Sequence, residues 1–130
     1  MPTSFRTLLL AALVGSYATT ARATNSVTIT NPTAGSTWSS GASVTVAGNT
    51  SYNWFIDTYP YHVMVKIIDV NQVIVSDTEA SYSGSYGSGT FSCPTHLSNP
   101  PDRCHIEARS YDYYWQQLAS QSITVTIWRM

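Results

Sequence analysis

The residue types that perform catalysis or bind metals are scattered along this sequence of 130 residues. The three histidines, His62, His96 and His105, lie in separate segments and lack the paired spacing of zinc ligands. No Gly-x-Ser-x-Gly motif marks a nucleophile. Glu107 and Asp112 are better explained by a solvated strand face than by a general acid and base pair. We therefore predict a protein that is not an enzyme, with no catalytic residue, no metal site and no cofactor.

The first 23 residues have the three parts of a secretory signal peptide. Arg6 gives a short positive segment, residues 8–14 form an apolar run, and Ala21-Arg22-Ala23 is a small-x-small cleavage site. The apolar run is about half as long as the roughly 20 residues that a membrane span needs. We therefore predict a signal peptide at 1–23, a single domain at 24–130, no membrane insertion, and a secreted, extracellular protein that can associate with the cell wall.

Charged side chains are few, and acidic ones are in excess after the leader. The chain beyond residue 23 keeps four Lys and Arg against seven Asp and Glu, a net charge of about −3. This balance provides no electrostatic attraction to nucleic acid or anionic lipid, so we predict no nucleic-acid partner. Carboxylates near predicted strand ends leave a structural calcium site as a minor alternative, at Asp69, Asp77, Glu79 and Asp112.

Cys93 and Cys104 are the only cysteines. An isolated pair in an exported protein is most simply a disulfide, and the Cys-x10-Cys spacing fits neither a redox dithiol motif nor a zinc pair. A bridge would close a loop of about a dozen residues and would stabilise the domain by roughly 3 kcal/mol in the chain-entropy model. We predict a Cys93–Cys104 disulfide.

The elements that must position these residues are strands. Short runs rich in Val, Ile, Thr and Tyr alternate with clusters of Gly, Pro, Asn and Ser, and no segment has a convincing helical pattern. About seven strands favour an all-β antiparallel sandwich of two sheets, with a small barrel as the alternative. The predicted strands cover 27–30, 44–47, 61–70, 73–82, 90–93, 104–109 and 122–128.

Two stretches resemble immunoglobulin-like modules of extracellular proteins. Residues 27–38 (VTITNPTAGSTW), followed by 41–46 (GASVTV), are similar to the opening of the N-terminal module of fungal cell-wall proteins implicated in β-1,6-glucan assembly, and of bacterial surface repeats. Residues 104–112 and 122–127 are similar to the last two strands of those repeats. The resemblance implies an immunoglobulin-like or fibronectin-III-like sandwich. Residues 113–117 (YYWQQ) differ from these modules, because the repeats have a Gly-Asn turn at this point. The resemblance transfers no functional residue to this sequence.

Aromatic residues are concentrated in three predicted connections that fall at one end of such a sandwich. Tyr and Trp offer a large contact area for little loss of rotamer entropy, and sugar rings stack on them. Asp57, Asp112 or Gln116 could bond the sugar hydroxyls. The alternative is that rings such as Trp54 and Phe55 cap the core. The candidate ligand-binding residues are Tyr52, Trp54, Tyr59, Tyr86, Tyr111, Tyr113, Tyr114 and Trp115.

Asn49-Thr50-Ser51 is an N-glycosylation sequon at the predicted start of the first aromatic connection. We predict glycosylation at Asn49, and a glycan there would shield part of the aromatic end. The leading functional hypothesis is a secreted, non-enzymatic binding module for a polysaccharide or a surface glycoprotein. The alternative is a structural protein that self-associates through an edge strand, with residues 122–128 as the candidate edge because of their high β-propensity and lack of charge.

Overall fold

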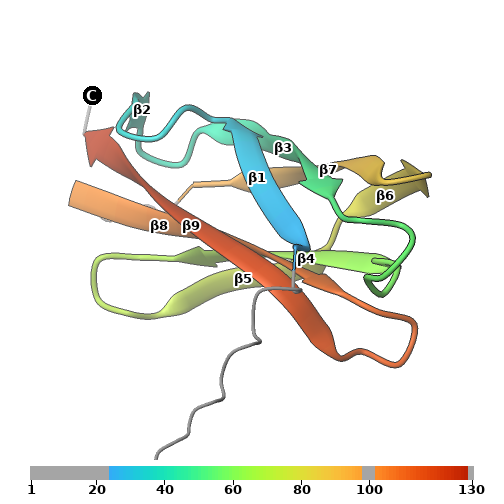
Figure 1. The fold of residues 1–130 in the computed structure, drawn as a ribbon. Helices are drawn as coiled ribbons and strands as arrows, with labels where there is room; N and C mark the ends of the chain where they lie inside the picture. Colours follow the sequence, from blue (N-terminus) through green and yellow to red (C-terminus); the bar gives the residue numbers. More distant parts are fainter. Residues whose placement is uncertain (1–23, 98–101, 129–130) are drawn as a thin grey trace, which may run out of the picture.

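The computed structural model describes residues 24–97 and 102–128, so the predicted signal peptide lies outside the described residues. Within them the fold is all-β, and two sheets pack face to face (Figure 1). The four-stranded sheet contains, in spatial order, β1 (Ser26–Asn31), β3 (Ser43–Ser51), β7 (Ser88–His96) and β6 (Ser81–Ser85). The five-stranded sheet contains β2 (Thr37–Ser39), β9 (Gln117–Trp128), β8 (Asp102–Tyr111), β4 (His62–Ile68) and β5 (Ile74–Glu79).

The core lies between the sheets, because alternate residues of the longer strands point inward. In β3 and β7 exposed and buried residues alternate along almost the whole strand, as a strand with one solvated face requires. Burying a Val or Ile side chain contributes roughly 1.5–3 kcal/mol each. The largest fully buried aliphatic side chains are Val46, Val63, Val65, Ile67, Ile106, Val125 and Ile127.

The described residues form nine strands where the sequence predicted about seven. The segment predicted as one strand over 73–82 divides at Ala80, which is buried and whose N–H bonds the Val63 carbonyl at 2.8 Å. Residues before Ala80 form β5 in one sheet, and residues after it form β6 in the other. The remaining extra strand, β2, is short and pairs parallel with β9, whereas the other strand pairings among the described residues are antiparallel, as predicted.

The edge that was predicted to be open at 122–128 is covered over its second half. Gly35 N–H bonds the Thr124 carbonyl at 2.8 Å, and Thr126 N–H bonds the Ser36 carbonyl at 2.9 Å. β2 then pairs with the last residues of β9. An incoming strand would have to displace these contacts, so this part of β9 is not the free edge that the self-association hypothesis assumed.

The two cysteines lie in the core. Cys93 on β7 and Cys104 on β8 belong to opposite sheets, and both are buried. The sulfur atoms of Cys93 and Cys104 lie 3.8 and 3.9 Å from the carbonyl oxygens of Pro94 and His105. The Cys93–Cys104 disulfide stays a prediction. Burial raises the pKa of the Cys93 thiol.

Candidate functional site

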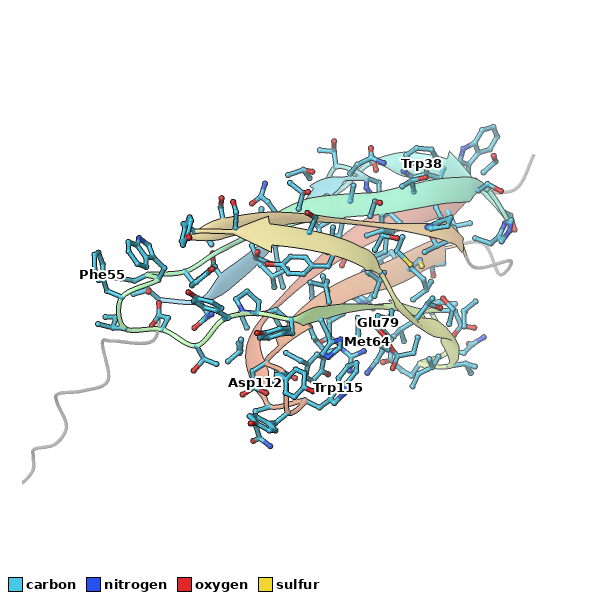
Figure 2. The ribbon with its side chains drawn as sticks, turned by 90° about the vertical axis from the view of Figure 1, so that its right-hand side faces the viewer. Trp38, Phe55, Met64, Glu79, Asp112 and Trp115 are labelled. Carbon is cyan, nitrogen blue, oxygen red and sulfur yellow. The ribbon has the colours of Figure 1, made fainter. Side chains whose placement is uncertain are left out.

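Three connections meet at one end of the sandwich: residues 52–61, the β6–β7 turn at 85–88, and residues 111–117. We call this end the aromatic pole. Figure 2 shows Phe55 at this end of the molecule and Trp38 at the opposite end. Many side chains here are far too exposed to be capping the core, since Phe55, Tyr86 and Tyr114 are 77%, 79% and 78% exposed. For Phe55 the alternative of core capping is therefore wrong.

The first connection is held in shape by Asp57. One carboxylate oxygen accepts the Asn53 N–H at 2.8 Å and also the Thr24 hydroxyl. These two bonds, the Thr24 bond foremost, lower the pKa of Asp57 below its ordinary value of 3.8. Asn25 adds a bond from its side-chain amide to the Thr58 carbonyl at 3.0 Å. The first described residues are thus attached to the aromatic pole.

Asp112 has the same role in the third connection. Its Oδ1 accepts the N–H groups of Tyr114 and Gln116 at 2.8 and 2.9 Å, and its carbonyl accepts the Trp115 N–H at 3.1 Å. Trp115 takes the left-handed conformation, with φ 63°. One oxygen each of Asp57 and Asp112 is therefore engaged in loop geometry. The expectation that these carboxylates bond a ligand's hydroxyls gives way to a structural role for those oxygens.

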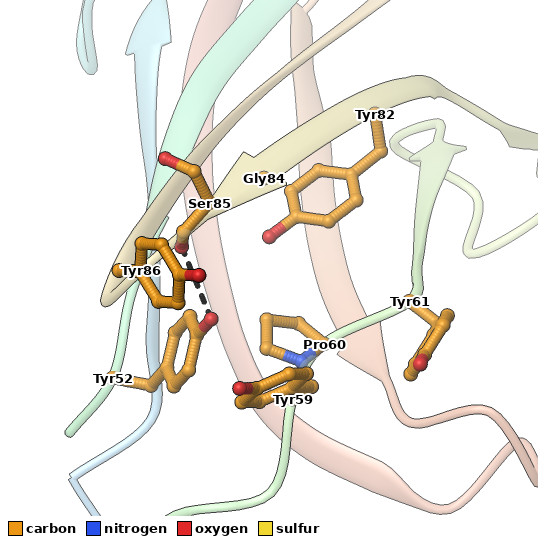
Figure 3. Close-up of a pocket in the computed structure, with 8 residues that line it drawn as sticks. All are labelled: Tyr52, Tyr59, Pro60, Tyr61, Tyr82, Gly84, Ser85 and Tyr86. Atoms are coloured by element: carbon orange, nitrogen blue, oxygen red, sulfur yellow. Dashed lines mark hydrogen bonds between the residues drawn. The ribbon is translucent and has the colours of Figure 1, made fainter. Parts of the chain in front are cut away.

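A cleft of about 380 Å³ opens beside the first connection (Figure 3). The Tyr52 and Tyr59 rings meet edge to face with their centroids 5.5 Å apart, and the Tyr52 hydroxyl bonds the Ser85 carbonyl at 3.1 Å. The lining combines aromatic faces with hydroxyl groups, which are the two kinds of contact that a sugar uses. The lining residues are Tyr52, Tyr59, Pro60, Tyr61, Tyr82, Gly84, Ser85 and Tyr86.

The deeper wall of this cleft depends on a pair of glycines. Gly84 and Gly89 face each other across β6 and β7. A Cβ at either position would lie 2.8 or 2.4 Å from the Tyr82 hydroxyl oxygen, so the bare backbone makes room for the Tyr82 ring. That hydroxyl forms a 2.7 Å bond with Thr50, and burial raises the pKa of Tyr82.

A second cleft of about 350 Å³ adjoins the first. The Tyr61 and Tyr113 ring centroids are 5.3 Å apart at 70°, and the Tyr113 and Tyr114 rings meet at 89°. Tyr59 and Tyr61 line both clefts, so they form a ridge between them. The complete lining is Thr58, Tyr59, Tyr61, Asp112, Tyr113 and Tyr114.

Three of the predicted residues line neither cleft. The Trp115 ring stacks on His62, with centroids 3.8 Å apart and planes 8° apart, and Tyr111 lies beside Trp115. His62 Nδ1 lies 2.7 Å from a Glu79 carboxylate oxygen, so this group faces outward on the five-stranded sheet. Trp54 instead stacks on Phe55 at the tip of the first connection and meets Tyr86 edge to face.

The structure brings Tyr52, Tyr59, Tyr86, Tyr113 and Tyr114 to the clefts, as the sequence placed them at one end. It also adds residues that were missing from the predicted set: Tyr61, Tyr82, Pro60 and Ser85. Tyr82 lies between exposed serines in β6, and this alternation is the signal that would have identified it as an inward-facing residue.

The aromatic pole contains the Asp57 and Asp112 carboxylates but no Lys or Arg among its described residues. The described basic residues lie elsewhere, with Lys66 and Arg109 on the outer face of the five-stranded sheet and Arg103 next to Asp102. In residues 24–97 and 102–128 no three His, Cys, Asp or Glu side chains are grouped as metal ligands would be. The same residues contain no helix of the length and apolar character required to cross a membrane.

Asn49 lies within β3 rather than at the start of an aromatic connection, which corrects its predicted placement. It is exposed on the outer face of the four-stranded sheet and pairs in register with Thr28 and Thr90. The next residue, Thr50, is buried. Strand alternation therefore presents the Asn49 amide to solvent, some way along the sheet from the clefts.

The sequence matches no protein-family model and no curated protein. Among solved structures, it is similar to the Pseudomonas fluorescens alkylpurine DNA glycosylase AlkC bound to DNA containing an abasic site analog, at 10% identity and a TM-score of 0.43. That similarity covers 81% of this chain and 31% of the other, so this chain spans about a third of that protein's length.

Proposed function

We propose that this protein is a secreted, non-enzymatic module that binds glycan through the two tyrosine-lined clefts of the aromatic pole. The observation that carries the proposal is the pair of adjoining clefts with the Tyr59–Tyr61 ridge between them. The ligand is a polysaccharide or the glycan of a surface glycoprotein, on the cell wall or on a host surface. We propose no catalytic role and no cofactor.

The chemistry of the clefts supports a sugar over a purely apolar ligand. Tyr61 is 52% exposed and Tyr59 is 44% exposed, so their ring faces can receive the CH face of a pyranose. Each ring also carries a hydroxyl that both donates and accepts hydrogen bonds. Tyr has few rotatable bonds, and the T-shaped contacts of Tyr59 with Tyr52 and of Tyr61 with Tyr113 limit the ring motion further.

We further propose that the fold is immunoglobulin-like. The spatial order β1-β3-β7-β6 corresponds to the A, B, E and D strands of that fold, and β9-β8-β4-β5 corresponds to G, F, C and C′. β2 then corresponds to a first strand that changes sheets and pairs parallel with the last one. In antibody variable domains the loops at one end of this sandwich form the binding surface, and the aromatic pole is the equivalent end here.

Binding can be tested by titrating the protein with neutral oligosaccharides, and by pull-down on insoluble cell-wall polysaccharides. Tyr61→Ala should weaken binding at least tenfold, because it removes one wall from both clefts. The control is Trp128→Ala, which removes a comparably exposed ring (48%) at the far end of β9. The proposal fails if no polysaccharide is retained, or if Tyr61→Ala and Trp128→Ala bind equally well.

A second candidate function is self-association through β5. This strand is an edge of the five-stranded sheet, and Val73, Ile74 and Val75 are 56%, 55% and 45% exposed at its start. Exposed apolar edge strands pair readily with other chains. Light scattering across a concentration series should then show dimers that Val75→Lys dissociates. A monomer at all concentrations would remove this candidate.

A further inference from the structure

The outer face of the four-stranded sheet carries an ordered array of neutral polar side chains, which we call the hydroxyl face. In the row nearest the aromatic pole, the strand register aligns Ser26, Ser51, Ser88 and Ser85 across all four strands. All four are exposed. Neighbouring strands lie about 4.8 Å apart, so the hydroxyls of this row are spaced at roughly that interval.

The next row repeats the pattern two residues further along each strand. It aligns Thr28, Asn49, Thr90 and Ser83, and these four are exposed as well. The four strands contain no Asp, Glu, Lys or Arg at all. The face therefore offers many hydrogen-bond donors and acceptors and no formal carboxylate, ammonium or guanidinium charge.

The hydroxyl face is continuous with the tyrosine clefts. Gly84 and Ser85 line the first cleft and also an open hollow of about 540 Å³ on the hydroxyl face. That hollow shares Asn49, Ser83 and Thr90 with a second hollow of about 540 Å³ further along the sheet. Hollowed surface thus extends from the aromatic pole onto the outer face of the four-stranded sheet.

We propose that the hydroxyl face extends the binding site, so that the ligand is a long, neutral polysaccharide rather than a short or an anionic glycan. This inference rests on the proposed function of the clefts. β3 and β7 each have nine residues, a length of about 30 Å, which accommodates several consecutive sugar units. A chain anchored on the Tyr59–Tyr61 ridge would leave the first cleft past Ser85 and lie along the sheet.

The chemistry of the face favours this occupant over others. A protein partner would need a buried apolar or aromatic anchor, and the outward positions of both rows hold only Ser, Thr and Asn. An anionic polymer would need Lys or Arg, which these four strands lack. A polysaccharide chain carries the same neutral hydroxyls as the face itself. Replacing one hydrogen bond to water with one to a sugar hydroxyl yields little free energy, so the affinity should rise with the number of sugar units in contact.

Chain-length dependence tests the extension separately from the clefts. Protein made in a host without N-glycosylation is titrated with the di- and trisaccharide and the long oligosaccharides of whichever neutral glycan binds in the pull-down. We expect affinity to rise about tenfold or more from short to long chains. Thr90→Glu should abolish that gain and leave short-chain binding unchanged. Thr126→Glu, an exposed position on the other sheet, is the matched control.

Thr90→Val, which keeps the side-chain shape, replaces Thr90→Glu if that variant does not fold. If short and long chains bind equally, or if Thr90→Glu weakens both to the same extent, the extension is wrong while the clefts remain the binding site. If an anionic derivative of the long chain binds more tightly than the neutral chain, the assignment to neutral polysaccharide is wrong. If no chain of any length binds, the proposed function itself fails.

Discussion

The outer faces of the two sheets follow the same alternation of buried and exposed residues but carry opposite chemistry. On the five-stranded sheet, Arg109 pairs with Asp77 at 2.5 Å and Lys66 with Glu107 at 3.6 Å. The four-stranded sheet presents neutral hydroxyls and amides instead. Charged side chains that are already paired contribute little to binding a ligand, because the ligand must first displace the existing ion-pair partner. Hydroxyls that face water can exchange it for a sugar at little cost.

The rings of the aromatic pole also differ in the surface that they extend. Tyr52 and Tyr86 follow from strands of the hydroxyl-bearing sheet and line the first cleft. Trp115, from the other sheet, turns away and stacks on His62 above the charged face. The comparison teaches that exposure of an aromatic ring does not by itself identify a binding residue. The contacts that the ring makes decide which surface it extends.

Among these variants, Gly48→Ala should cause the largest loss of stability, and it should do so in the four-stranded sheet. A Cβ at Gly48 would stand 1.9 Å from the Thr28 carbonyl oxygen and 2.8 Å from the Phe91 ring. Since the first of these atoms is backbone, β1 would have to shift away from β3 and the hydroxyl rows would lose one strand. We expect a loss of about 3 kcal/mol in the free energy of unfolding, measured with urea. Ala47→Ser, the outward neighbour, should change it by less than about 0.5 kcal/mol.

Arg109→Met should have the next largest effect on stability and none on glycan binding. The Arg109 side chain is only 14% exposed, contacts Asp77 and Glu107, and donates to the Tyr111 hydroxyl at 2.9 Å. Removing it leaves two carboxylates without this cation, and we expect a loss of about 1–2 kcal/mol in urea unfolding. Salt should narrow the difference between variant and wild type. A marked fall in polysaccharide affinity would show that the two faces are not independent.

A glycan on Asn49 should interfere with the hydroxyl face, because this residue stands in its second row. Protein from an N-glycosylating host, with occupancy at Asn49 checked by mass spectrometry, should lose the tenfold gain for long chains and keep its affinity for short ones. Enzymatic removal of the glycan should restore the gain. Equal chain-length dependence with and without the glycan would contradict the assignment of this face.

The smallest effect concerns Asp57. Its pKa is lowered in the folded protein by the Thr24 hydroxyl and the Asn53 N–H, so the folded state binds this proton less readily than the unfolded state does. The contribution to stability is therefore present above the ordinary pKa of 3.8 and is lost as the pH falls through the lowered value. Thr24→Val should move the pKa of Asp57 upward in an NMR titration. An unchanged pKa of Asp57 in this variant would contradict the role of the Thr24 hydroxyl.

Local patterns predicted much of this molecule. Alternation in 44–47, 104–109 and 122–128 identified strands that the structure contains, and turn residues correctly separated them. The change of sheets at Ala80 was missed, because one buried alanine between two short strands looks like a continuation of either. The placement of Cys93 and Cys104 in the core depends on which sheets face each other, and their spacing along the chain carries no such information.

The candidate site was predictable only as a region. Connections at one end of a sandwich must lie near one another, which brought most of the tyrosines into the predicted set. The contact between the Tyr61 and Tyr113 rings joins segments that are far apart in the chain. The stack of Trp115 on His62 requires the left-handed backbone conformation of Trp115, which local sequence preferences do not predict. The hydroxyl rows depend on strand register, which residue composition does not contain.

The contacts of Thr24 with Asp57 and of Asn25 with Thr58 place residue 24 next to the aromatic pole, which limits where this protein can be fused or immobilised. Anything fused ahead of residue 24 would emerge beside the clefts and crowd them. Trp128, at the far end of β9 and paired with Ser39, points the other way. If the protein is attached to a support through the Trp128 end, the tyrosine-lined clefts face away from that support. An immobilised or displayed form should therefore be attached at this end.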